Sequence, residues 1–498
     1  MSSSHTLKLE RLFRSTISPV DKNFITQALR EAEKETRKLS VAIMSLERKR
    51  NELKERMERY RSLLSPIHRL PPEVLANIFT ICGEDFNDIH PIKMPPAVAV
   101  SLVCGRWRSV ALSTPFLWSS IRITFRNWEW GQHEKVARLT ETYLSRSKTS
   151  PLHLKMDITC IDDGADVDIT PALDVLVQNS SRWRTLDIIC RPWVWQTSTL
   201  RGVRGRLSKL RHLRLSAFSD GEDDAADDLE IINTNIFDDC PDLHSLCLMP
   251  NSSDALSAIV LPWHQIQNLE LESSEIRTAM LFITRCPNLQ RVEFNNHNFI
   301  GMEEVDDVEV VTSSVKSLSI SLYQSPQVFQ VLTVPSLTSL EIGHLSFVRD
   351  LRPIEDCIRR SSCNLTSFKL GPAPVSCKQV LSLLSLMPKL QSLHIYEWDQ
   401  PHLDRTQPYK IIADTFLHEF TRTSFLPQLR HLDLTAVEPL PQHAILDALA
   451  SRCIPDGSEA NVARLQSVSI TTAQISSELL SLLESFSDVG VRMFVTIR

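Results

Sequence analysis

The pattern of apolar and polar positions divides the chain into three regions, and the longest, from about residue 150 to the end, repeats itself. The motif L-x-x-L-x-L, with Ile, Val, Phe or Trp as substitutes, recurs there at spacings mostly between 22 and 28 residues. The eleven units read WRTLDI, LRHLRL, LHSLCL, IQNLEL, LQRVEF, VKSLSI, LTSLEI, LTSFKL, LQSLHI, LRHLDL and LQSVSI. They begin at Trp183, Leu210, Leu243, Ile266, Leu289, Val315, Leu337, Leu365, Leu390, Leu429 and Leu465.

Each unit predicts a short strand whose last two apolar residues point inward, while the residue between them faces outward. One strand and one helix cannot bury their apolar faces alone, so such units stack into a solenoid with a continuous core. The pattern therefore predicts an α/β solenoid of about 11–12 irregular leucine-rich repeats over residues 150–498. The alternative is leucine periodicity from unrelated helices, but this number of matches at related spacing is hard to obtain by chance.

Residues 21–64 contain neither proline nor glycine, and their apolar residues recur at alternating steps of four and three. These positions form a seam of Ile25, Leu29, Ala32, Leu39, Ile43, Leu46, Leu53, Met57, Tyr60 and Leu64. The spacing predicts a long charged helix with the heptad pattern of a coiled coil, weakened by Thr36 and Arg50 on the seam. Two interpretations stay open. The helix leans singly on the next domain, or it binds a partner or forms a homodimer through residues 21–64.

Prolines divide residues 65–124 into three short helices, because proline is tolerated in a first turn and poorly inside a helix. We expect these helices at about 72–82, 97–112 and 115–120. The segment GEDFNDIHPIKMPP between the first two is interpreted as a loop. Residues 1–20 are expected to be a flexible N-terminus, and residues 125–149 a linker to the solenoid.

Composition and charge narrow the class of protein. The 498-residue chain is 42% hydrophobic and 23% charged, which is typical of a folded soluble protein with several domains. A net charge of −6 argues against a nucleic-acid partner, because phosphate binding needs a basic face. No apolar run reaches the roughly 18 residues that span a bilayer, so no membrane partner is expected. The first residues also lack the apolar core of a signal peptide.

The chemistry-bearing residues point away from an enzyme. Eleven cysteines are scattered singly, without a Cys-x-x-Cys pair or a Cys/His cluster at zinc spacing. Several, such as Cys104 and Cys247, stand where an apolar residue is wanted, which favours a reducing compartment, cytoplasmic or nuclear. The chain has no Gly-rich phosphate loop, G-x-S-x-G or H-E-x-x-H motif. We therefore expect no catalytic residues, no metal and no cofactor, and we interpret the acidic run DGEDDAADDLE at 220–230 as a solvated insertion.

Residues 67–118 resemble an F-box, the three-helix module that docks onto the adaptor subunit of cullin-RING ubiquitin ligases. Its hallmarks are a Leu-Pro-x-Glu opening, an Ile-Phe pair, a Val-Cys-x-x-Trp segment and a terminal Leu-Trp. The resemblance rests on Leu70, Pro71, Glu73, Leu75, Ile78, Phe79, Leu102, Val103, Cys104, Trp107, Arg108, Leu117 and Trp118. The loop over residues 83–96 is longer than in compact members. The chain is similar here to the F-box-like form common in mushroom-forming fungi, where a heptad helix precedes the domain and a leucine-rich region follows it.

The resemblance implies an adaptor-binding module formed by Leu70, Pro71, Glu73, Leu75, Ile78, Phe79, Val103, Cys104, Trp107, Leu117 and Trp118. Pro71 fixes the backbone where the first helix starts, and the helix dipole favours Glu73 in the first turn. Because the opening lies at the helix edge, Leu70, Pro71 and Leu75 are expected on the partner surface. Val103 and Trp107 could instead form the module's own core.

An F-box followed by leucine-rich repeats resembles the substrate receptor of an SCF-type ubiquitin ligase, which is not itself catalytic. The F-box would bind the adaptor, and the solenoid would hold a target protein near the conjugating enzyme. The alternative is a leucine-rich interaction scaffold outside any ligase, with a divergent F-box.

The target would meet the outward positions of the strands. These are Asp187, Arg214, Cys247, Glu270, Glu293, Ser319, Glu341, Lys369, His394, Asp433 and Ser469. Glu270, Glu272 and Glu293 should cluster on adjacent strands, which suggests a basic segment on the target. Glu341 belongs to the same face. Trp193, Trp195, Tyr396 and Trp398 follow strands and could be exposed anchors or buried loop residues.

Overall fold

The chain divides into two compact units, Met1–Asn77 and Ile78–Arg498, which are described separately. The computed structural model describes residues 13, 16–82, 86–125, 132–159, 170–190, 194, 198–217, 235–249, 259–272, 276–296, 310–322, 328–343, 350–397, 410–422, 424–453 and 462–497. The predicted anchors Trp193, Trp195 and Trp398 and the acidic run at 220–230 lie outside these residues. Among the described helices, none combines the length and the apolar character that a bilayer crossing requires.

The first unit is dominated by the single helix α2 (Pro19–Leu64). Ser18 caps its start, because the Ser18 hydroxyl accepts from the Asp21 amide while the Asp21 carboxylate accepts from the Ser18 amide. Pro19 occupies the first turn, and the helix ends at Leu64, before Pro66. None of its 46 residues is buried. The short η1 (Pro66–Arg69) follows, and the boundary between the units falls within α3 (Pro72–Cys82).

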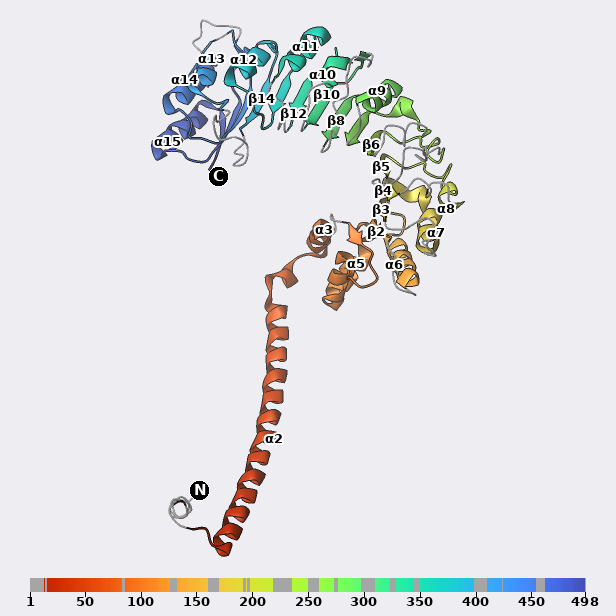
Figure 1. Ribbon diagram of the computed structural model, residues 1–498, viewed down its shortest axis with the longest axis vertical. Helices are drawn as coiled ribbons and strands as arrows, with labels where there is room; N and C mark the ends of the chain where they lie inside the picture. The colour runs from red at the N-terminus through yellow and green to blue at the C-terminus, as the bar shows by residue number, and fades with distance from the viewer. Residues whose placement is uncertain are drawn as a thin grey trace. The chain divides into compact units, whose positions relative to one another are not determined.

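The second unit is built on one parallel sheet in which the strands follow one another in chain order (Figure 1). Its described strands are β1 (Asn87–Asp88), β2 (Ser120–Thr124), β3 (Leu152–Ile158), β4 (Trp183–Cys190), β5 (His212–Ala217), β6 (Ser245–Met249), β7 (Asn268–Glu272), β8 (Arg291–Asn296), β10 (Ser317–Leu322), β12 (Ser339–Ile342), β13 (Ser367–Leu370), β14 (Ser392–Tyr396), β15 (His431–Ala436), β16 (Ser467–Thr472) and β17 (Arg492–Ile497). A separate pair joins β9 (Val311–Thr312) to β11 (Leu332–Thr333). Each of the eleven sequence units lies at one strand, from β4 to β16.

Helices connect the strands, and those from α6 onward lie along one side of this sheet (Figure 1). They are α4 (Pro96–Leu102), α5 (Gly105–Ser113), α6 (Gln132–Ser147), α7 (Thr170–Gln178), α8 (Ser198–Arg201), α9 (Ile276–Arg285), α10 (Val328–Val331), α11 (Arg352–Ser361), α12 (Cys377–Ser385), α13 (Asp414–Glu419), α14 (Gln442–Cys453) and α15 (Ser477–Ser485). Short 3-10 turns occur at η2 (Pro115–Trp118), η3 (Ser180–Arg182), η5 (Trp263–Gln265) and η7 (Phe486–Val489).

The core lies between the sheet and these helices. In a typical strand such as β7, Leu269 and Leu271 are buried while Glu270 between them is half-buried on the other face. The same alternation runs through β2, β3, β12, β13, β14 and β16. The predicted alternation is therefore confirmed in these strands, whereas on β6 the predicted outward residue Cys247 is itself buried. The helix-free side of the sheet, here called the open face, presents the outward residues.

Three expectations about the boundaries need correction. The helix expected at 97–112 is two helices, α4 and α5, because Cys104 adopts an extended conformation between them (φ −159°, ψ 170°). The segment expected to be a linker at 125–149 contains α6, whose residues Val136, Tyr143 and Leu144 are buried. The solenoid sheet also begins before residue 150, since β2 already pairs with β3.

Candidate protein-binding surfaces

The opening of the F-box-resembling segment lies in the first unit and is partly exposed. Pro71 and Glu73 are exposed and Leu70 is half-buried at the end of η1. Glu73 stands in the first turn of α3, as predicted. Leu75, which we expected on the partner surface, has none of its surface exposed, so this expectation is wrong. It occupies an inward position of α3, where a leucine stabilises the fold.

In the second unit, an aromatic contact joins α3 to α5. The Phe79 and Trp107 rings lie 4.9 Å apart at 53°, with Phe79 buried and Trp107 half-buried. Cys104 explains the spacing of the Val-Cys-x-x-Trp motif, because its Sγ accepts from the Trp107 amide at 3.5 Å and caps α5. Cys104 therefore serves as a helix cap rather than as the apolar filler that the sequence suggested. Ile78 is half-buried on the same helix as Phe79.

The terminal Leu-Trp pair is structural. Leu117 and Trp118 are both buried, and the Trp118 indole Nε1 donates to the Ala111 carbonyl at 2.8 Å. The Trp118 ring meets Tyr143 edge to face at 5.0 Å and lies 4.4 Å below the Arg146 guanidinium. Burial raises the pKa of the Tyr143 hydroxyl well above its usual range. These contacts tie the end of the module to α6, so neither Leu117 nor Trp118 is available to a partner.

One buried residue that no sequence motif marks holds this region together. Asn87, in the segment predicted to be a loop, is fully buried in β1. Its Nδ2 donates to the carbonyls of Leu117 (3.0 Å) and Ser120 (3.1 Å). Its Oδ1 accepts from the Ala97 amide (3.0 Å) and the Tyr143 hydroxyl (3.3 Å). All four hydrogen-bonding positions of the carboxamide are used, and α4, η2, β2 and α6 meet at this side chain. No local sequence signal marks it, because its partners lie 10 to 56 residues away.

Large apolar side chains remain exposed on this part of the second unit. They are Ile81, Ile92, Met94, Leu102, Val103, Leu112 and Phe116. Val103 is the last residue before the Cys104 cap and has 60% of its surface exposed, so it is not part of the module's core. Exposed apolar side chains concentrated in a short segment mark a protein-binding surface.

The open face of the solenoid carries the predicted row of outward residues in continuous register. From β2 to β17 the paired positions are Arg122, Lys155, Asp187, Arg214, Cys247, Glu270, Glu293, Ser319, Glu341, Lys369, His394, Asp433, Ser469 and Phe494. Opposite charges stand on neighbouring strands and pair across them. Lys155 meets Asp187 at 2.8 Å, and Lys369 meets Glu341 at 2.5 Å. The face is therefore a row of paired charges of both signs.

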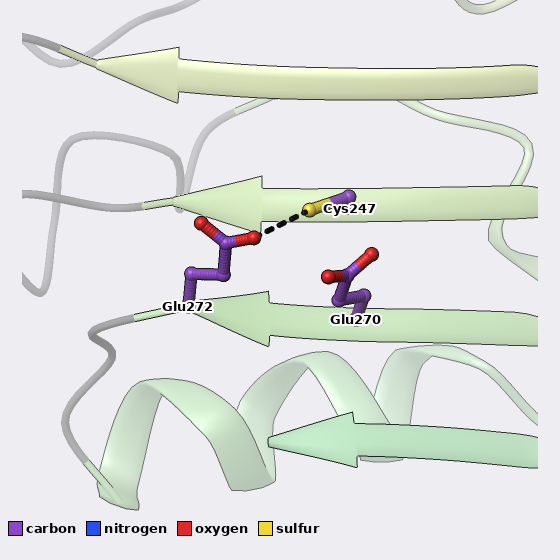
Figure 2. A group of neighbouring side chains, drawn as sticks. All are labelled: Cys247, Glu270 and Glu272. Atoms are coloured by element: carbon purple, nitrogen blue, oxygen red, sulfur yellow. Dashed lines mark hydrogen bonds between the residues drawn. The ribbon is translucent and has the colours of Figure 1, made fainter. Parts of the chain in front are cut away.

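The predicted acidic cluster is only partly paired within the chain, because one cation, Arg214, faces the carboxylates of Glu270 and Glu272. The expected basic segment on the target stays a prediction. Figure 2 shows Glu270, Glu272 and Cys247 gathered on β6 and β7. Arg214 on β5 reaches this group, with Nη1 2.6 Å from Glu272 and Nη2 3.3 Å from Glu270. Glu293 is held from its own strand, because Asn295 Nδ2 donates to both Glu293 and Glu270 at 3.0 Å.

Burial and the neighbouring arginine set the electrostatics of this cluster. Burial raises the pKa of the Glu272 carboxyl, and Arg214 partly offsets that rise. Burial also raises the pKa of the Cys247 thiol well above its usual range, so it stays protonated. Its Sγ lies 3.9 Å from Glu272 (Figure 2). In this structure the cation that the two carboxylates hold is the Arg214 guanidinium.

The other end of the open face contains a second charged group. His394 Nδ1 lies 3.2 Å from the Asp433 carboxylate. Tyr396 is half-buried, with the Lys369 ammonium 5.8 Å from its ring centre. Lys369, His394 and Tyr396 come from adjacent strands and leave part of each side chain accessible to a partner.

Two comparisons with known proteins bear on these surfaces. A search of curated proteins found no match to the chain. A family model described as F-box-like matches residues 67–124, from η1 to the end of β2. The match covers the three helical segments, the Asn87 junction and the first long strand of the sheet. Residues 67–124 of this chain therefore form an F-box-like domain.

Proposed function

We propose that the chain is a substrate-recognition subunit of an SCF-type ubiquitin ligase. The observation that carries the proposal is the F-box-like domain at residues 67–124, because F-box domains bind Skp1-type adaptors in cullin-RING ligases. F-box proteins are typically non-catalytic adaptors. The chain would act in the cytoplasm or the nucleus, where such ligases meet their targets.

The adaptor-binding surface would use the accessible residues of the domain. In the second unit these include Ile81, Val103 and Phe116. Leu70 and Pro71, in the first unit, are proposed to contact the adaptor on the F-box resemblance of the Leu-Pro-x-Glu opening. Burying one such apolar side chain contributes about 1.5–3 kcal/mol, so a few of them supply the affinity of a stable complex. The buried motif residues would act indirectly, by holding the accessible ones in place.

The target would bind the open face of the leucine-rich solenoid. Its charges of both signs favour a target surface that also carries both signs, since Asp187, Glu272 and Glu341 each stand beside a cation. Lys369, His394 and Tyr396 offer a partly accessible cation, a titratable ring and an aromatic side chain on adjacent strands. The chain would accelerate ubiquitin transfer by holding the target at high local concentration near the conjugating enzyme.

The proposal is tested by titrating purified Skp1-type adaptor into the full-length chain in a calorimeter. Wild type should bind with one adaptor per chain. Val103→Glu should weaken binding by about 10-fold or more, because a charge replaces apolar contact area in the interface. The double variant Leu70→Ala/Pro71→Ala should also weaken it.

The matched control is Val310→Glu, which changes a valine of similar exposure (57%) outside the F-box-like domain and should bind the adaptor as wild type does. Equal binding by wild type and Val103→Glu would exclude Val103 from the interface. Absence of binding by wild type would contradict the ligase proposal and favour the alternative of an interaction scaffold with a divergent F-box.

A further inference from the structure

The apolar seam of α2 has no cover within the structure. Along the described helix the seam residues Leu29, Leu39, Ile43, Leu46, Leu53, Met57, Tyr60 and Leu64 each expose half of their surface or more. They recur at the steps of a heptad repeat, with Leu39, Leu46 and Leu53 at d positions and Ile43 at an a position. An uncovered apolar stripe on a 46-residue helix is the surface of a coiled coil that lacks its partner.

The charges that flank the seam change sign along the helix. At the e and g positions of the N-terminal part stand Glu33 and Glu35. At the same positions of the C-terminal part the charged residues are Glu47, Lys49, Lys54, Arg56 and Arg61, of which Glu47 alone is acidic and stands nearest the middle of the helix. Lys54 and Arg56 form no ion pair with any residue in the described part of the chain. A helix with acidic flanks at one end and basic flanks at the other is complementary to itself when reversed.

We propose that α2 pairs with α2 of a second copy of this chain as an antiparallel coiled coil. In one register, Ile43 packs against the partner's Leu46 and Leu29 against the partner's Tyr60. The same register sets Glu33 opposite the partner's Lys54 and Glu35 opposite the partner's Arg56. By symmetry each of these contacts occurs twice, and no like charges meet across the flanks.

A parallel pair fits the same residues poorly. In the parallel register, g positions face e positions of the partner, so Lys49 meets the partner's Lys54 and Arg56 meets the partner's Arg61. The two Arg50 side chains would also meet in the core, whereas the antiparallel register sets each Arg50 beside the partner's Leu39. Charge pairing therefore selects the antiparallel arrangement.

The arrangement has a consequence for the F-box-like domains. The paired segment runs over residues 25–64, which is about 60 Å at 1.5 Å per residue. The two Leu64 ends lie at opposite ends of it, and each is followed within three residues by the F-box-like domain of its own chain. The dimer would therefore start its two F-box-like domains from points about 60 Å apart. This inference does not depend on adaptor binding.

The test is the mass and the dissociation constant of the full-length chain by analytical ultracentrifugation. Wild type should sediment as a dimer. Lys54→Glu/Arg56→Glu and Glu33→Lys/Glu35→Lys should each weaken self-association by about 100-fold, because four attractive contacts become repulsive. An equimolar mixture of these two variants should restore the dimer, since every flank contact between them is again attractive.

A matched control reverses two charges that point away from the seam, Lys34→Glu/Arg48→Glu, and should leave the dissociation constant within about threefold of wild type. Stronger association of Lys54→Glu/Arg56→Glu would indicate a parallel pair and overturn the proposal. A monomeric wild type would overturn it as well. So would a dimer that survives Leu39→Glu/Leu46→Glu, because that dimer would not use the seam.

Discussion

Asn87 gives the sharpest test of how the F-box-like domain is joined to the solenoid. Its carboxamide is fully buried and makes four hydrogen bonds to α4, η2, β2 and α6. Asn87→Ala removes all four partners at once and leaves polar groups facing an apolar methyl. We expect the variant to fold but to open locally around β2 and α4.

The magnitude follows from the groups left without partners. Counting the Ala97 amide and one of the two carbonyls as unsatisfied, at about 1–3 kcal/mol each, the free energy of local opening falls by about 2–6 kcal/mol. Asn87→Asp adds a dependence on pH. The buried carboxyl faces the carbonyls of Leu117 and Ser120, so its pKa in the folded state rises above about 4. The protonated acid can donate to a carbonyl and the carboxylate cannot, so the loss of stability should grow as pH rises from 5 to 8.

Hydrogen exchange on the full-length chain measures this opening. For Asn87→Ala, amides in residues 96–125 should exchange at least about 30-fold faster, which corresponds to 2 kcal/mol, while amides of β15 and β16 should not change. The control Asn288→Ala removes an exposed carboxamide that donates to a single carbonyl, and it should leave residues 96–125 unaffected. An Asn87→Ala chain whose exchange in this segment stays within about threefold of wild type would refute the account of this junction.

Three further substitutions test the electrostatics of the solenoid. Arg214→Met should destabilise the chain by about 1–3 kcal/mol at pH 7, because it strips the cation from partly buried carboxylates. This loss of unfolding free energy should be smaller at low pH, because Glu272, whose pKa is raised, takes up a proton there and no longer needs the cation. Urea unfolding at pH 5 and pH 7 measures the difference. Burial and then Arg184 lower the pKa of His153, so protonation favours the unfolded chain and stability should fall below about pH 6.5. His153→Gln should flatten that slope, and an unchanged slope would exclude His153 as its source. Arg452→Met should lower the free energy of unfolding in urea by about 3 kcal/mol or more, because the buried guanidinium donates to several carbonyls, including that of Phe420. A decrease below about 1 kcal/mol would contradict this structural role of Arg452.

The repeated strands could be predicted from the sequence because each strand is specified by the alternation of apolar and polar residues within its own unit. A unit such as LRHLRL places its two inward leucines and its outward arginine by alternation alone, and β5 has that arrangement. The same holds for the opening of α3, where proline and glutamate positions follow from the chemistry of a helix start. The heptad seam on α2 could also be predicted from the sequence, because the spacing of its apolar residues follows from the number of residues per helical turn.

The rest depends on contacts between distant residues. Asn87 and Tyr143 are 56 residues apart, and Arg214 and Glu272 are 58 apart, so no local pattern predicts that they meet. For the same reason the sequence did not show that Glu270 and Glu272 have a cation partner, because Arg214 lies two strands away on β5. Leu75 was assigned to the partner surface, and both a core and a surface role stayed open for Val103, because a single apolar residue in a short helix fits a core and an interface equally well. Only the packing around each of them decides between the two.

The most direct test of the central claim is co-sedimentation of the full-length chain with purified Skp1-type adaptor and cullin. If the F-box-like domain docks the adaptor, the chain should enter a single complex with both proteins, and it should fail to join the cullin when the adaptor is omitted. A chain that sediments alone while adaptor and cullin form their own complex would contradict the proposed role in a ubiquitin ligase.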